Sequence, residues 1–135
     1  MHIFFLDKRL FFGILFVLTL QGCTTLADAR KAEGEGVRKV YKADIETTWK
    51  KTIQVLGKLN LDVATENKQE GYILAQRGMG VFQMSYGENI AIFLKPKTAT
   101  ETEVEVVSKK VMTTNIFAPD WSDDIQKQLN LTFSN

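Results

Sequence analysis

Between residues 61 and 110, apolar and polar side chains alternate in several short runs separated by turns. The alternation is clearest in three stretches: LDVATE from Leu61, NIAIFLK from Asn89 and TEVEVVSKKV from Thr102. GYILAQR, from Gly71, and VRKVYK, from Val37, are two further strand candidates. A strict alternation gives a strand one buried and one solvated face, which is typical of antiparallel sheets. We therefore predict an antiparallel sheet of about five strands, with one face exposed to water.

Two stretches instead repeat their apolar residues at helical spacing. The first follows Asp44, a good amino-terminal cap, and Asn60 can close it in a left-handed conformation. The second begins near Pro119 and Asp120. Their apolar stripes consist of Ile45, Trp49, Ile53 and Leu56 in the first and Trp121, Ile125, Leu129 and Phe133 in the second. The element order is β-α-β-β-β-β-α. It predicts an α+β fold, a two-layer sandwich with both helices on one face of the sheet.

The amino terminus has the layout of a secretory signal peptide. Lys8 and Arg9 form a positive region, and the apolar run from Leu10 to Leu20 follows it. This run is shorter than the roughly 20 apolar residues that a membrane-spanning helix needs. Extending the span backwards would bury the charges of Asp7, Lys8 and Arg9, which is costly. The next residues favour a lipid-anchored chain over the two alternatives, a transmembrane anchor and an ordinary secreted protein.

The residues Leu20-Gln21-Gly22-Cys23 resemble the lipobox of bacterial lipoproteins, with an aliphatic, a variable and a small residue before the cysteine. The resemblance implies a diacylglycerol thioether at Cys23, cleavage between Gly22 and Cys23, and acylation of the new amino terminus. The residue after the cysteine is Thr24 rather than aspartate. By the rule of this family in Gram-negative bacteria, the protein is expected at the periplasmic face of the outer membrane. In a source with a single membrane, it is expected at the cell membrane.

Processing is expected to leave a small chain with no net charge. Removing residues 1–22 from 135 leaves 113, enough for one domain, which we place at 37–135 behind a lipidated, flexible tether at 23–36. Loss of Asp7, Lys8 and Arg9 takes 17 basic and 16 acidic residues to 15 of each. This neutral balance argues against nucleic acid as a partner and against a polybasic membrane tether. The acyl chains must therefore carry the membrane attachment.

The only histidine, His2, is removed with the signal, and the only cysteine carries the lipid. A chain without histidine or a free thiol excludes Ser-His-Asp and Cys-His nucleophilic sites and zinc sites of the His/Cys type. We therefore expect no enzyme activity, no metal and no cofactor.

The phrases ETTWKKTIQVLGKLNLDV, from Glu46, and QEGYILAQ, from Gln69, resemble a group of small bacterial lipoproteins. More distantly, they resemble the domains of the outer-membrane lipoprotein BamC. The shared positions are mostly core positions, so the resemblance implies a fold rather than an activity.

Three groups of residues are candidates for a site. RGMGVFQMSYGEN, from Arg77, fits a bulged strand or an apolar partner-docking loop that presents Met79, Phe82, Met84 and Tyr86. Trp49 and Trp121 are either core residues or a ligand-stacking pair. The carboxylates comprise a strand row that we expect to be solvated, Glu101, Glu103 and Glu105, and a helix-start cluster, Asp120, Asp123 and Asp124.

Three functions are compatible with these patterns. The first is a non-catalytic interaction or structural module, with an envelope protein as its partner. The second is a small periplasmic lipoprotein that binds an apolar ligand between sheet and helices, in a pocket lined by Trp49, Phe93 and Trp121. The third, a carboxylate-based hydrolase, requires two convergent carboxylates in a cleft.

Overall fold

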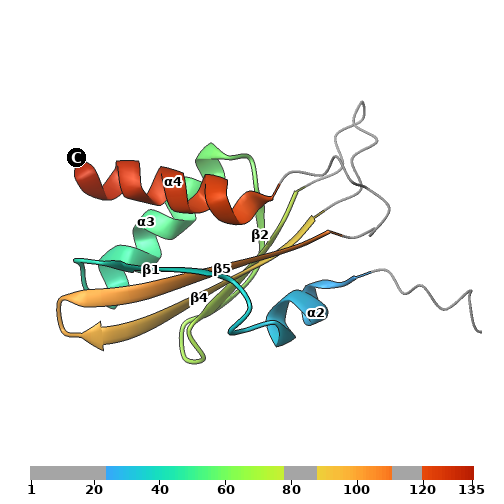
Figure 1. Cartoon of the computed structure of the whole chain (residues 1–135), viewed down its shortest axis with the longest axis horizontal. Coiled ribbons are helices and arrows are strands. Elements are labelled where there is room, and N and C mark those ends of the chain that lie inside the picture. The colour runs from blue at the N-terminus through green and yellow to red at the C-terminus, as the bar shows by residue number, and fades with distance from the viewer. Residues whose placement is uncertain (1–23, 78–87, 111–119) are drawn as a thin grey trace, which may run out of the picture.

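The five predicted strands form one antiparallel sheet, seen in a computed structural model that describes residues 24–77, 88–110 and 120–135. β4 and β5 are the long central strands, and β1 and β2 lie at the two edges (Figure 1). Across the sheet the order is β1 (Val37–Tyr41), β5 (Glu101–Lys110), β4 (Glu88–Thr98), β3 (Tyr72–Gln76) and β2 (Asp62–Asn67). The α+β class, the strand number and the order of these elements are as predicted.

Helices α3 (Ile45–Lys58) and α4 (Trp121–Ser134) cover the same face of the sheet (Figure 1). Asp44 caps α3 by accepting a hydrogen bond from the Thr47 backbone at 2.8 Å, and Asn60 follows the helix with φ of 54°. Both features confirm the helix boundaries predicted from the sequence. The main core lies between these helices and the sheet and includes Val55, Leu56, Ile73, Ile90, Ile92, Leu94, Val104, Val106, Ile125 and Leu129.

The prediction of a flexible tether at 23–36 is wrong for residues 24–36, the part that the structure describes. Residues Leu26–Lys31 form a short helix, α2, which packs on the sheet face opposite α3 and α4 (Figure 1). Ala29 and Ala32 are buried there against Leu74, Ala91, Phe93 and Val107. This stretch lacks an apolar stripe long enough to suggest a helix, and six residues are too few to hold a helix without tertiary support. The sheet supplies that support.

The packing of α2 also covers part of the sheet face that the strand pattern assigned to solvent. Glu105 is only 3 % exposed, so the prediction of a solvated glutamate row is wrong at this position. Glu103 is one fifth exposed and pairs with Lys97 at 3.2 Å, as expected of a strand-surface carboxylate. Alternation alone cannot reveal that α2 and the residues after it cover one end of this face. Within the described ranges, no helix is both long and apolar enough to cross a bilayer.

Candidate functional site

Residues 24–36, which we call the stem, begin at the end of the sheet where β4 starts and β5 finishes. The Thr24 hydroxyl donates to the backbone oxygen of Lys110, and the Asn89 amide nitrogen donates to the backbone oxygen of Thr24 at 2.8 Å. Asn89 is almost fully buried, and its amide oxygen accepts from Gln76 at 2.9 Å. The first described residue after Cys23 is therefore held by two strands.

A capping box then starts α2. The Thr25 hydroxyl accepts from the Asp28 backbone at 3.3 Å, and the Asp28 carboxylate accepts from the Thr25 backbone at 2.7 Å. This reciprocal pair satisfies donors that a helix amino terminus otherwise leaves free. The hydrogen bonds from Thr25 lower the pKa of Asp28 below its ordinary value. The chain is thus helical from the third residue after Cys23.

Glu105 fastens the other end of the stem. Its carboxylate accepts from the backbone of Gly34 at 2.7 Å and of Gly36 at 2.8 Å, and from the Arg38 side chain at 3.2 Å. Gly36 has to be glycine, because a Cβ there would lie 2.4 Å from the backbone oxygen of Val106. A buried carboxylate that accepts several hydrogen bonds and meets a cation is a strong, directional contact.

Ion pairs link the middle of the stem to the sheet. Glu33 lies 2.6 Å from Lys95, and this contact lowers the pKa of Glu33 and raises that of Lys95. The Arg30 guanidinium pairs with Glu70 at 3.1 Å and lies 4.2 Å from the centre of the Tyr72 ring. The stem is consequently fastened along its whole described length.

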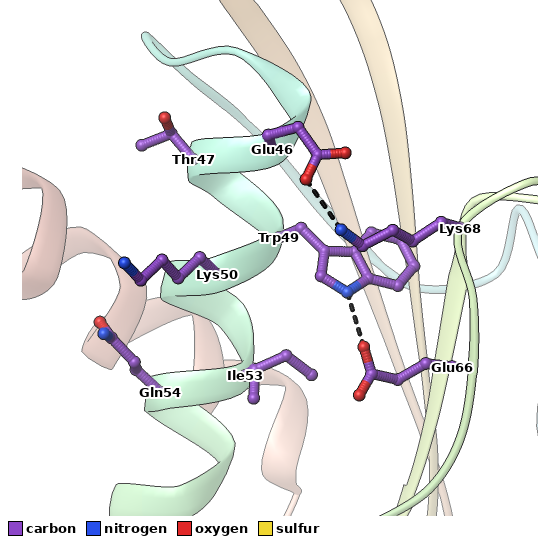
Figure 2. Close-up of a pocket in the computed structure, with 8 residues that line it drawn as sticks. All are labelled: Glu46, Thr47, Trp49, Lys50, Ile53, Gln54, Glu66 and Lys68. Atoms are coloured by element: carbon purple, nitrogen blue, oxygen red, sulfur yellow. Dashed lines mark hydrogen bonds and ion pairs between the residues drawn. The ribbon is translucent and has the colours of Figure 1, made fainter.

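A groove of about 620 Å³ opens between α3 and the edge strand β2. Figure 2 shows Trp49 and Ile53 projecting from α3 toward the β2 side, where Glu66 and Lys68 meet them. The Trp49 indole donates to Glu66 at 2.8 Å, and Lys68 pairs with Glu46 at 2.8 Å. The remaining lining residues are Thr47, Lys50 and Gln54. The groove has an apolar floor and charged walls of both signs.

The predicted trio of Trp49, Phe93 and Trp121 does not line one pocket. Phe93 belongs to the α2 side of the sheet, whereas both tryptophans belong to the core under α3 and α4. The Trp121 indole donates to Glu88, which is 1 % exposed, so each tryptophan has a carboxylate partner. No feature of the sequence pairs Trp49 with Glu66 or Trp121 with Glu88. These contacts arise only when the sheet and helices meet.

The carboxylates at the start of α4 cap the helix or lie in its first turn. Asp120 caps α4 by accepting from the Ser122 backbone at 2.9 Å, and Asp123 and Asp124 lie exposed in the first turn. The part of the chain at 24–77, 88–110 and 120–135 contains no cluster of three or more potential metal ligands. Cys23 and Gly22 lie outside the described residues, as do the predicted docking residues Met79, Phe82, Met84 and Tyr86.

The residues that sequence reasoning missed are Asn89 and Glu105, which hold the two ends of the stem. The sequence presents Glu105 only as one member of a solvated row, and a lone asparagine at the start of a strand carries no signal. Comparison with protein-family models found no match, and comparison with curated proteins found no significant one.

Proposed function

We propose that this chain is a lipid-anchored module of the bacterial cell envelope, attached through acylated Cys23 and acting by interaction rather than by catalysis. The lipobox-like residues Leu20 to Cys23 support the attachment. The observation that carries the proposal is the fastened stem, because a folded, sheet-bound segment begins directly after the cysteine. A stem of this kind suits a body that must keep a fixed position beside a membrane.

The absence of histidine and of a free thiol from the processed sequence supports a non-catalytic role. The location proposed is the periplasmic face of the outer membrane, or the cell membrane where there is only one. The partner proposed is another envelope protein.

The attachment is tested by intact-mass spectrometry of the full-length gene product purified from a Gram-negative host, with Cys23→Ser as the matched variant. We expect the wild-type chain to begin at residue 23 and to carry the added mass of its acyl groups. The serine variant lacks the thiol and is expected to keep its signal and gain no lipid. A wild-type chain with Met1 in place, or with a bare thiol, refutes the proposal.

A second candidate function is the binding of an apolar ligand, and the groove between α3 and β2 favours it. Its floor is formed by the buried Trp49 and the partly buried Ile53, and its volume of about 620 Å³ lies in the range of small-molecule sites. The charged walls fit a ligand with a flat apolar part and polar ends.

The groove can be probed with the dye 1-anilinonaphthalene-8-sulfonate, whose fluorescence rises at apolar surfaces. We expect Ile53→Ser to lower this signal, because it removes the apolar floor. The control is Leu131→Ser, which removes a side chain that is 53 % exposed on α4, away from the groove. Equal signals from the two variants count against a binding groove.

A further inference from the structure

The stem begins at one end of the sheet, where hydrogen bonds hold its first residue, and we call this end the anchor end. Its residues are Thr24, Gln76, Asn89 and Lys110. In the strand register, Gln76 pairs with Asn89, and Asn89 is next to Glu88, the partner of Lys110. The turn between β4 and β5, at residues 98–101, lies at the opposite end (Figure 1).

Cys23, the proposed site of lipid attachment, is joined directly to Thr24, which is held at the anchor end. Consecutive Cα atoms are about 3.8 Å apart, so the Cα of Cys23 stays within that distance of the Cα of Thr24. A flexible segment of thirteen residues would instead span roughly 20 Å and let the domain turn freely. The hydrogen bonds of Thr24 to Asn89 and Lys110 remove that slack.

The side of the domain that carries the stem is poorly suited to lying flat on a membrane. The exposed side of α2 carries Asp28 and Lys31, charges of both signs, beside the small Ala27. Among the described residues, the large exposed apolar side chains are Val37, Val40 and Leu131, and none of them is on α2. Without an apolar face, α2 gains nothing from contact with lipid.

We infer that the domain stands on the membrane with its anchor end against the lipid headgroups and β4 and β5 rising away from the surface. The inference rests on the proposed attachment at Cys23. At about 3.3–3.4 Å per residue, β5 carries the opposite turn roughly 30 Å from the headgroups. In this orientation the anchor end faces the bilayer surface, and the turn at 98–101 is presented to the periplasm.

Two single-cysteine variants of the lipidated chain test this orientation. Lys110→Cys labels the anchor end at a residue whose backbone, not its side chain, holds the stem, and Thr100→Cys labels the exposed opposite turn. Each is labelled with nitrobenzoxadiazole and placed in phosphatidylethanolamine/phosphatidylglycerol vesicles containing a headgroup spin-labelled lipid. We expect several-fold stronger quenching at position 110 than at position 100. Equal or reversed quenching overturns the inference.

Two matched stem variants, measured with both labels, test whether the stem sets the orientation. Ala29 is fully buried on the inner face of α2 and Ala27 is exposed on the same helix, so Ala29→Glu should release the stem and Ala27→Glu should not. We expect the quenching difference to disappear in the first variant and to persist in the second, with the far-ultraviolet circular dichroism of both unchanged in its strand signal. A difference that survives Ala29→Glu contradicts a role for the stem.

Intact mass of each labelled sample separates the two possible failures. A chain without lipid overturns both the attachment and the orientation. A lipidated chain with equal quenching at the two labels overturns the orientation alone and leaves the attachment standing.

Discussion

Glu105 shows how one side chain can change the role of a whole segment. It belongs to a strand whose first half has a glutamate at every second position, Glu101, Glu103 and Glu105, and such a row is usually solvated. Here it is buried and receives two backbone N–H groups and one guanidinium. A buried carboxylate is tolerated here because its oxygens accept these hydrogen bonds and its charge is neutralised by Arg38. It closes the stem onto the sheet.

Glu105→Gln is expected to lower the free energy of unfolding by about 1–3 kcal/mol, because it replaces charge-assisted hydrogen bonds by neutral ones and adds donors facing donors. Urea denaturation of the purified chain measures the change. Glu103→Gln is the control on the same strand, and loss of its pair with Lys97 should cost no more than about 1 kcal/mol. Equal losses in the two variants would contradict the role given to Glu105.

Alanine substitutions at two glycines are expected to change the stability in opposite directions. A Cβ at Gly36 would meet the Val106 backbone oxygen at 2.4 Å, so Gly36→Ala should destabilise the chain by about 1–3 kcal/mol. A Cβ at Gly57, inside α3, meets nothing within 4 Å, so Gly57→Ala should stabilise it by about 0.5–1 kcal/mol. Thermal unfolding of both variants checks the signs, and stabilisation by Gly36→Ala would refute the close approach of stem and β5.

At the scale of elements, α2 is a helix that exists because of its surroundings. Six residues do not form a stable helix alone, and its apolar side chains are mainly alanines. The capping box supports its first turn, and burial of Ala29 and Ala32 beside Phe93 supports its inner face. The longer helices α3 and α4 differ, because their apolar stripes are already visible along the chain.

The pair of Glu33 and Lys95 makes the hold on the stem depend on pH. The pKa of Glu33 is lowered from 4.5, so its contribution is present above that value and is lost as the pH falls through the lowered pKa. The pKa of Lys95 is raised from 10.5, so its contribution is complete below that value and is lost as the pH rises through the raised pKa. The pair therefore acts between these limits.

A double-mutant cycle with Glu33→Gln and Lys95→Met measures this contribution by urea denaturation. Both side chains are about a third exposed or more, so the coupling energy at neutral pH should be only about 0.2–1 kcal/mol. It should vanish in acid and in strong alkali. A coupling that persists after Glu33 is protonated would show that the contact is not ionic.

At the scale of the molecule, the sheet lies between the stem helix and the groove. The stem helix packs on one face of the sheet, and the groove lies on the other side, between α3 and β2. In the orientation that we propose, this groove and the turn at 98–101 stay accessible from the periplasm. That separation agrees with an interaction module whose attachment does not obstruct its binding surface.

The sorting rule of the lipoproteins that residues 20–23 resemble gives a prediction for the whole chain, which rests on the proposed attachment at Cys23. Thr24→Asp should move the protein from the outer to the inner membrane, measured by density-gradient separation of the two. Thr24→Ala is the control, because it also loses the hydroxyl bond to Lys110 but introduces no aspartate, and it should stay in the outer membrane. Relocation of the alanine variant would mean that the stem contact, rather than the aspartate, decides sorting.

The sequence by itself was sufficient to predict the five strands, the two long helices, the cap of the first helix and the order of these elements. These features depend on local periodicity and on single capping residues such as Asp44, which act over a few positions. Cys23, with its preceding residues, is likewise a local signal. The proposed attachment therefore stems from the sequence, whereas the fastening of residues 24–36 to the sheet is known only from the structure.

Only the tertiary structure decided that the stem is fastened, that Glu105 is buried, and that Phe93 lies on the opposite face from Trp49 and Trp121. These outcomes depend on partners far apart along the chain, such as Gly34 and Glu105, which are 71 residues apart. A strand's pattern shows which side chains share a face, but not what will cover that face. The cover is set when distant segments pack together, because burial and hydrogen bonding are properties of the assembled chain.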